Sequence, residues 1–250
     1  MFLQPLEKNI LLNPFPMKAV EIHPHLFIED LALRYKNILI ISDLQLGYEE
    51  ALESQGILLP RFQLKDIIER LDNIFMTVSV EKVVINGDLK HEFGTITNQE
   101  WRDTLRLFDY LLTKVKEIII IKGNHDLALE PIATKRNIHV VDSYVIDNIS
   151  ILHGHIIPLQ LQDIIIIGHE HPAISFPELK TEKYKCFLKG PWQKKTLIVM
   201  PSFTPLTIGS DVTRERPLSP FLKHGVQNFH VFVVEDTVRY FGTVGDVSKL

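Results

Sequence analysis

Five short groups of Asp, Asn, Gln and His residues each follow an apolar run of this chain. The groups are Ser42-Asp43-Leu44-Gln45, Gly87-Asp88, Gly123-Asn124-His125-Asp126, His153-Gly154-His155 and Gly168-His169-Glu170-His171. Carboxylate, imidazole and amide oxygen all bind borderline or hard divalent cations, and no thiolate site competes because Cys186 is the only cysteine. A lone Gly-Asp is usually a turn, and a lone His-x-His usually lies on the surface. Five such groups in succession are far harder to explain as turns, so they predict a metal site.

Each of these groups stands at the end of a predicted strand. The first three strands are Asn37–Ile41, Lys82–Asn86 and Glu117–Lys122, and predicted helices over Arg61–Met76 and Asn98–Val115 separate them. This alternation favours parallel strand–helix–strand units with right-handed crossovers. Ligands bind at the carboxyl ends of the strands in open α/β sheets, so we expect the side chains that follow these strands to meet there.

The second half of the chain is richer in predicted strands. Asp147-Asn148 predicts a tight hairpin that joins the first two of them. The expected strands are Tyr144–Ile146, Ile149–His153, Ile164–Ile167, Thr196–Met200, His230–Val234 and Val238–Phe241. Near the N-terminus, we expect an irregular stretch up to about Pro24 and one strand over Phe27–Arg34. The pattern as a whole predicts an α/β sandwich of two sheets rather than a single doubly wound sheet.

Composition places the chain among ordinary soluble globular proteins. With 250 residues, 45% of them hydrophobic, it can bury a core without disulfides or a structural metal. A formal net charge of −4 argues against a globally basic nucleic-acid-binding surface. Its apolar runs are shorter than the roughly 18 residues of a membrane span, and we find no secretory signal. We therefore expect one cytoplasmic domain over residues 1–250, with no membrane association and no indication of oligomeric state.

The five groups, in this order, resemble the motifs of the calcineurin-like metallophosphoesterases. That family carries Asp-x-His, Gly-Asp, Gly-Asn-His-Asp/Glu, a His often followed by Gly, and Gly-His-x-His. The likeness runs from Asp43 to His171, with Gln45 standing where the family usually has His. Further segments resemble the ICC-like, DNA-ligase-associated branch of the family. They are Asp43–Glu49, Gly87–Gly94, Cys186–Gly190, Met200–Phe203 and Gly209–Val212.

The resemblance implies a fold and a role for each residue. The fold would be a four-layer α/β/β/α sandwich with mixed sheets and two divalent metal ions at its mouth. The first metal would be held by Asp43, Gln45, Asp88 and His171, and the second by Asp88, Asn124, His153 and His169. His125 would contact the substrate, with Asp126 placed to orient it. Because Gln45 offers a neutral amide oxygen in place of imidazole, Mn²⁺ is favoured over Zn²⁺ or Fe²⁺, and Mg²⁺ is a further candidate.

Two other histidines and Gln45 itself have open roles at this point. His91 would either compensate for Gln45, contact the substrate or lie on the surface. His155 would either face the substrate or have a purely structural role. Gln45 would either bind the first metal or leave that place to water.

The function implied by the resemblance is phosphoester hydrolysis, with phosphodiesters of nucleotides or nucleic-acid ends as the favoured substrates. A hydroxide shared by two metals would attack phosphorus in line, while the His125 imidazolium stabilises or protonates the leaving oxygen. The gene neighbourhood of the resembled branch suggests DNA repair by analogy. One alternative, motivated by Gln45, is a scaffold of this fold with weakened catalysis. Another is a lipid-linked pyrophosphate hydrolase, ranked last because no apolar groove or amphipathic cap helix is evident between Pro172 and Pro220.

A basic stretch in the second half allows two interpretations. Lys183–Lys195 contains five Lys and no acid, with Tyr184, Phe187 and Trp192 interleaved. The favoured interpretation is a solvated charged loop. The other is a phosphate-tracking edge beside the active site, whose aromatic rings stack on bases. The surrounding residues 172–228, rich in Pro and turn formers, are the expected place of a cap that selects the substrate.

Overall fold

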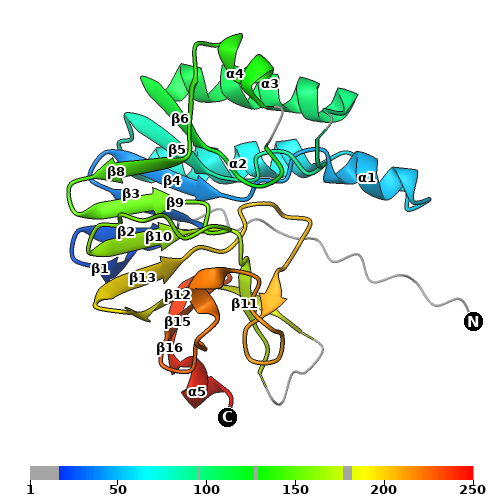
Figure 1. Cartoon of the computed structure of the whole chain (residues 1–250). Helices are drawn as coiled ribbons and strands as arrows, with labels where there is room; N and C mark the ends of the chain where they lie inside the picture. Colours follow the sequence, from blue (N-terminus) through cyan, green and yellow to red (C-terminus); the bar gives the residue numbers. More distant parts are fainter. Residues whose placement is uncertain (1–16, 95, 127–128, 177–181, 250) are drawn as a thin grey trace, which may run out of the picture.

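Two β-sheets lie face to face at the centre of the protein (Figure 1). The computed structural model describes residues 17–94, 96–126, 129–176 and 182–249. One sheet has seven strands and the other has nine. Apolar side chains of both sheets share one core between them. This arrangement confirms the predicted two-sheet α/β architecture.

The seven-stranded sheet carries the first three predicted groups. Its strands, in spatial order, are β1 (Val20–His23), β2 (Leu26–Glu29), β3 (Ala32–Tyr35), β4 (Ile38–Ser42), β5 (Lys82–Asn86), β6 (Glu117–Ile121) and β7 (His139–Val141). Strands β1 to β4 are antiparallel, and β4 to β7 are parallel. Ser42 pairs with Asn86, and Asn86 pairs with Ile121. The carboxyl ends of β4, β5 and β6 are therefore level.

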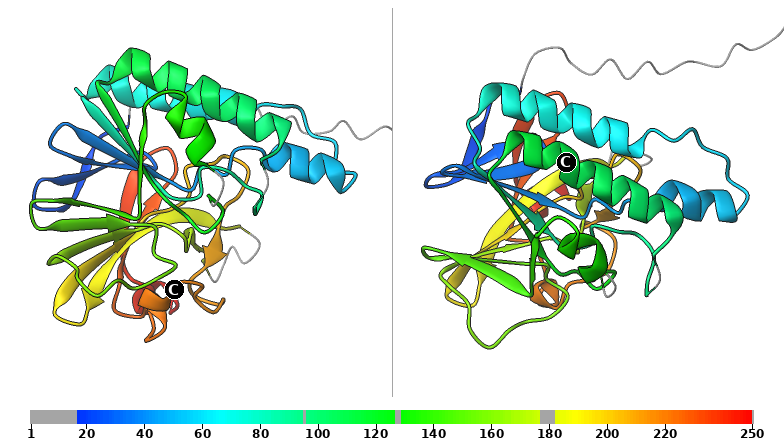
Figure 2. Two further views of the ribbon diagram at one scale, coloured as in Figure 1. Left: turned by 45° about the horizontal axis from the view of Figure 1, so that its top comes forward. Right: turned by 90° about the horizontal axis from the view of Figure 1, so that it is seen from above.

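Helices cover the outer face of this sheet (Figure 2). They are α2 (Gln63–Thr77) and α3 (Asn98–Lys114), with the short helix α4 (Glu130–Thr134) beside α3, whereas α1 (Tyr48–Ser54) extends beyond the edge of the sheet. The two long helices each bury one apolar stripe, for example Ile67, Leu71 and Ile74 of α2. At the start of α3, Thr97 and Glu100 form a capping box, which satisfies two N–H groups left without partners there.

The nine-stranded sheet carries the last two groups. Its strands are β8 (Ser143–Ile146), β9 (Ile149–Leu152), β10 (Ile164–Ile167), β11 (Pro172–Ile174), β12 (Tyr184–Trp192), β13 (Lys195–Val199), β14 (Ser210–Asp211), β15 (His230–Val234) and β16 (Val238–Thr243). The parallel strands β9, β10 and β13 lie side by side. Ile167 pairs with Leu152, so His153 and Gly168 begin level with each other.

The all-isoleucine strand β10 shows why both faces of this sheet are apolar. Ile164 and Ile166 belong to the core between the sheets, whereas Ile165 and Ile167 belong to a second core on the far face. That far face is covered by the 3-10 helix η1 (Pro220–Leu222), by Val226 and Phe229 of the segment that follows it, and by the helix α5 (Val244–Val247) (Figure 1). The four layers of the expected sandwich are thus present, with a thin outer layer on this side.

Two predictions near the N-terminus were wrong. The expected single strand over Phe27–Arg34 is a hairpin, β2 and β3, in which Glu29 pairs with Ala32. Asp30 makes the reversal possible with a φ of 58°, a conformation that Asp tolerates better than most residues. The stretch up to Pro24, expected to be irregular, contains β1.

The basic stretch Lys183–Lys195 is not a solvated loop, because most of it forms strand β12 inside the nine-stranded sheet. Phe187 and Trp192 are buried, so their rings are not available for stacking on bases. Lys185 donates hydrogen bonds to the carbonyl oxygens of Ser202 (2.7 Å) and Thr204 (2.6 Å). Lys189 and Lys195 likewise donate to backbone carbonyl oxygens, at Ile22 and Leu161. Three of the five lysines thus bind the protein's own backbone, which corrects both interpretations of the stretch.

The expected cap over residues 172–228 overlaps the sheet. Strands β12 and β13 fall within that range and are part of the nine-stranded sheet. A cap that selects the substrate therefore stays a prediction for the remaining pieces of the range. No helix in the described part of the chain is long and apolar enough to cross a membrane.

Candidate metal centre

The five predicted groups meet at one end of the two sheets, where backbone hydrogen bonds join their loops. The N–H of Asp43 donates to the carbonyl oxygen of Gly87 (3.2 Å), and the N–H of Gly168 donates to that of His153 (2.9 Å). Asp43 also links the sheets, because its Oδ2 accepts the N–H of His169 at 3.1 Å. Residues far apart in the sequence are thus held around one point.

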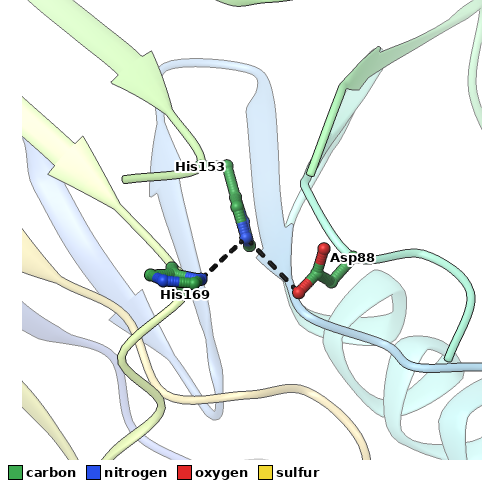
Figure 3. Close-up of side chains that lie close together, drawn as sticks. All are labelled: Asp88, His153 and His169. Carbon is green, nitrogen blue, oxygen red and sulfur yellow. Dashed lines mark hydrogen bonds and ion pairs between the residues drawn. The ribbon is translucent and has the colours of Figure 1, made fainter. Parts of the chain in front are cut away.

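His153 lies at the middle of one cluster of ligand atoms (Figure 3). Its Nε2 is 3.0 Å from Oδ1 of Asn124, 3.1 Å from Nδ1 of His169 and 3.3 Å from Oδ2 of Asp88. One ligand atom each from Asp88, His153 and His169 lie within 4.8 Å of one another. Two imidazoles, a carboxylate and an amide oxygen are a donor set that suits a divalent cation.

A second cluster is formed by Asp43 and His171. Oδ1 of Asp43 is 3.2 Å from Nε2 of His171 and 3.5 Å from Nδ1 of His153. All three atoms are buried, and none makes a hydrogen bond within the described residues. A buried polar atom without a partner costs about 1–3 kcal/mol. Three such atoms facing one another fit a site whose missing partner is a cation.

The backbone of Gln45 is hydrogen-bonded to the loop that carries Asp88 and to helix α2. Its N–H donates to the carbonyl oxygen of Asp88 (2.9 Å), and its own carbonyl oxygen accepts from Nε2 of Gln63 (2.9 Å). The Gln45 side chain is buried. The residue is therefore part of the centre's framework, while metal binding by its amide stays a prediction.

Backbone conformation at the strand ends is unusual in a consistent way. Positive φ angles occur at Asp43 (54°), Gln45 (49°), Asp88 (40°), His169 (64°) and His171 (46°). Residues other than Gly in this conformation cost about 1–3 kcal/mol each and cluster at functional sites. The fold thus accepts backbone strain at five of the predicted residues in order to hold them at the centre.

Two glycines leave room for the carboxylates. A Cβ at Gly123 would overlap the Asp88 carboxylate and backbone, and one at Gly168 would overlap Ser42 and the Asp43 carboxylate. Both positions therefore require glycine because of close approach rather than turn conformation.

Electrostatic effects in the centre oppose one another. Burial raises the pKa of Asp88, but His153 and His125 outweigh it and hold this pKa below its usual value. Burial lowers the pKa of His153, yet contacts with Asp88 and Asp43 outweigh burial and raise it to about 9. Burial, together with the neighbouring His153, lowers the pKa of His169 to about 4. In the metal-free protein, the proton on His153 thus balances part of the acidic charge, in the position that a cation would take.

His125 lies on one side of the centre. Its backbone N–H donates to Oδ1 of Asp88 (3.0 Å), and its ring Nε2 is 3.8 Å from Oδ2 of Asp88. Nδ1 bonds to the carbonyl oxygen of His91, which only accepts, so Nδ1 carries the proton. The Phe93 ring packs on the His125 ring with centroids 3.6 Å apart, and the His91 ring packs on Tyr48 at 4.4 Å. His91 therefore positions His125 through its backbone.

Asp126 does not contact the His125 ring in the way the resemblance implies. Its buried carboxylate accepts the backbone N–H groups of Gly123 (3.0 Å), Leu89 (3.3 Å) and Lys90 (3.3 Å). Burial raises the pKa of Asp126 to about 6. The residue ties the loop after β5 to the loop after β6, and so acts on the centre through backbone positions.

His155 lies beside two of the proposed metal ligands, His153 and His169. Its ring centroid is 5.2 Å from that of His153 and 6.1 Å from that of His169. The imidazole is half-buried and lines a hollow beside Asn124. This placement leaves both substrate contact and a structural role open to His155.

Sequence reasoning assigned no role to three residues that shape the centre. Ser42 donates a hydrogen bond from Oγ to Oδ2 of Asp43 (2.5 Å), and its place at a strand end was a usable signal. Phe93 covers His125 and lies inside the quoted segment Gly87–Gly94. Gln63 carried no local signal, because its partners are distant in the sequence.

Comparisons with known proteins identify the family and the fold of this chain. The sequence model of the calcineurin-like phosphoesterases matches residues 36–225, which is well over half of the chain. A solved structure of the nuclease MPE from Pseudomonas putida is 17% identical, with a TM-score of 0.64, and covers 90% of this chain and 100% of its own. This likeness shows a shared fold.

A protein of unknown function from Aquifex aeolicus is 18% identical, with a TM-score of 0.36 over 54% of this chain and 78% of its own. No curated protein matches the sequence. By the match to the family's sequence model, this chain belongs to the calcineurin-like phosphoesterase family and is a metal-dependent hydrolase of phosphoester bonds.

Proposed function

We propose that the protein is a phosphodiesterase that uses two divalent metal ions, Mn²⁺ foremost, to hydrolyse nucleotides or nucleic-acid ends. The observation that carries the proposal is the presence of two adjacent ligand clusters, Asp43 with His171 and Asp88 with His153 and His169. His153 contacts members of both clusters. A cytoplasmic location and a part in DNA repair belong to the same proposal, by analogy with the resembled branch.

The proposed ligands divide between the two ions. Asp43, Gln45 and His171 would hold the first ion, and Asn124, His153 and His169 would hold the second. Asp88 would bridge them. With only two carboxylates in this set, the loaded centre keeps a positive charge that favours a phosphate. A bound metal pair supplies polarisation of the phosphate oxygens and an activated water nucleophile.

His125 is the residue proposed to act on the leaving group. Because the His91 carbonyl oxygen holds the Nδ1 proton, any further proton on the ring resides at Nε2. That proton stabilises the leaving oxygen or passes to it, a contribution of typically about 10²–10⁴-fold. The ring itself stays in place because Phe93 packs on it.

Two observations support nucleotides or nucleic acid as the substrate class. The solved structure with a shared fold is described as a nuclease. In this chain, Phe93 is 60% exposed beside His125, so its ring offers an apolar surface next to the leaving group. Bases stack on such rings with little sequence preference.

The test is hydrolysis of bis-p-nitrophenyl phosphate by metal-stripped protein supplied with Mn²⁺, Mg²⁺, Zn²⁺ or no metal. We expect Mn²⁺-dependent turnover that Asp88→Asn abolishes, because the change removes the bridging carboxylate. Asp147→Asn is the matched control, since this aspartate is an exposed turn residue paired with Lys36. Wild-type rates in Asp88→Asn would refute the proposal. Calorimetry showing two Mn²⁺ per chain would in turn count against a mere scaffold.

A further inference from the structure

A hollow of about 500 Å³ opens beside the candidate metal centre. Asn124 and His153 form part of its wall, so the hollow is continuous with the place proposed for the phosphate. His155, Leu152 and Ile156 line it further. Its volume falls in the range of small-molecule sites, about 300–1,000 Å³.

The charges around the hollow do not favour a second phosphate. Lys122 lines it, but its Nζ is paired with Oε1 of Glu130 at 3.1 Å. Asp142 lies in the wall and adds a negative charge. A phosphate or carboxylate in the hollow would thus meet a carboxylate and a cation that is already paired.

The remaining wall suits a ring. Leu152, Ile156 and Pro158 supply apolar surface, and Ile156 exposes 63% of its area. Two polar residues also line this wall: the Asp142 carboxylate accepts hydrogen bonds, and the Ser143 hydroxyl donates or accepts them. Apolar walls with a few polar groups are typical of sites that bind uncharged rings carrying hydroxyl or amino groups.

The position of the hollow indicates which half of a diester it would receive. His125, proposed to act on the leaving oxygen, lies with His91 and Phe93. None of these three residues is among those that line the hollow. Of the two ester groups on phosphorus, the leaving group therefore belongs on the His125 side, and the other belongs on the Asn124 side.

We propose that the hollow beside Asn124 and His153 binds the non-leaving ester group of a phosphodiester, and that this group is an uncharged, ring-bearing alcohol of nucleoside size. The inference rests on the proposed phosphodiesterase function and adds the subsite that would select its substrate. Asp142 and Ser143 would bind the hydroxyl or amino groups of the ring system, and Ile156 would pack on its face.

Two diesters with the same leaving group test the subsite. Thymidine 5′-(p-nitrophenyl) phosphate and methyl p-nitrophenyl phosphate both release p-nitrophenol, so only the retained group differs. With Mn²⁺, we expect the wild-type kcat/KM to be about tenfold or more higher for the thymidine ester, the order of effect that a filled apolar pocket produces. A ratio near one in the wild type would overturn the inference.

Two variants address the wall directly. Ser143 is exposed on β8 and lines the hollow, so Ser143→Trp would fill the space, and Ile156→Asp would add a charge to it. Each change should bring the kcat/KM ratio down toward one. The matched controls are Val145→Trp, two residues along the same strand, and Leu159→Asp, which is fully exposed; neither lines the hollow, and the ratio should hold in both.

The outcomes separate this inference from the proposed function. Hydrolysis of both esters with an unchanged ratio in Ser143→Trp and Ile156→Asp would refute the subsite and leave the phosphodiesterase standing. A preference for p-nitrophenyl phosphocholine over the thymidine ester would also refute it, in favour of a cationic group held by Asp142. Absence of hydrolysis of either ester with every metal would refute the proposed function itself, and the inference with it.

Discussion

Gln63 Nε2 donates a hydrogen bond to the backbone carbonyl oxygen of Gln45 at 2.9 Å, which places an α2 residue directly behind the candidate metal centre. The same amide donates to Oγ1 of Thr204 at 2.9 Å. Gln63 is buried, and Glu49 accepts its backbone N–H at 2.8 Å. The loop that carries Asp43 and Gln45 is therefore held by a helix that contributes no ligand.

Replacing Gln63 with Leu should weaken metal binding as well as the fold. The change leaves buried polar partners at Gln45 and Thr204 unsatisfied, which costs about 1–3 kcal/mol in the free energy of unfolding. Loss of such supporting contacts typically reduces metal affinity about 10–100-fold. Urea denaturation and calorimetric titration with Mn²⁺ measure the two effects. Gln99→Leu is the control, because Gln99 is equally buried but bonds to Glu49. Equal losses of Mn²⁺ affinity in both variants would refute a positioning role for Gln63.

Asp126→Asn should act on the loops and not on proton transfer. An amide cannot accept all three backbone N–H groups that the carboxylate accepts, so we expect about 1–3 kcal/mol of lost stability and weaker Mn²⁺ binding. With saturating Mn²⁺, the shape of the pH–rate profile should match the wild type. A displaced acid limb of that profile would instead show that Asp126 acts through His125.

Gln45→His should shift the metal preference toward Zn²⁺. Imidazole binds Zn²⁺ better than a neutral amide oxygen does, and Gln45 lies buried against the Asp43 and Asp88 loops. Competition between Mn²⁺ and Zn²⁺, followed by calorimetry and by activity, measures the shift. An unchanged preference would place residue 45 outside the coordination of the metal.

Metal binding should release protons at neutral pH. The pKa of His153 in the metal-free protein is raised to about 9, so this ring is protonated at pH 7 and must lose its proton to bind a metal. Apparent Mn²⁺ affinity should therefore rise with pH between about 6.5 and 8.5, by at most about tenfold per pH unit. Calorimetry in two buffers of different ionisation enthalpy counts the protons. Release of no protons at pH 7 would contradict the arrangement of His153 between Asp43 and Asp88.

The bounds of strands and helices with a clear hydrophobic pattern were predicted to within a residue or two. β5 spans Lys82–Asn86 and β10 spans Ile164–Ile167, as expected, because strands buried on both faces appear as unbroken apolar runs. α3 ends one residue before its predicted end. In each case, local sequence and burial agree, so the pattern alone was sufficient.

Prediction failed where distant contacts override local pattern. The five lysines of Lys183–Lys195 suggest a solvated loop, yet Lys185 and Lys189 donate to backbone carbonyl oxygens, at Ser202 and at Ile22. The strand β12 is stabilised by pairing with β13 on one side and β15 on the other. These pairings cannot be predicted from the charges of the stretch alone.

The sequence by itself determined the alternation of β4, β5 and β6 with the helices α2 and α3, the two-sheet class of the fold and the five groups of candidate ligands. Each group directly follows a strand whose apolar run is visible in the chain. Only the tertiary structure decided which ligand atoms meet. Asp43 and His171 come from different sheets, and their approach to 3.2 Å depends on how those sheets pack. The turn of Asp126 toward backbone N–H groups and the support of Gln45 by Gln63 were also decided there. Hydrogen bonds between residues distant in the sequence leave no periodic trace in it, so the strand pattern predicts where side chains gather but not which of them touch.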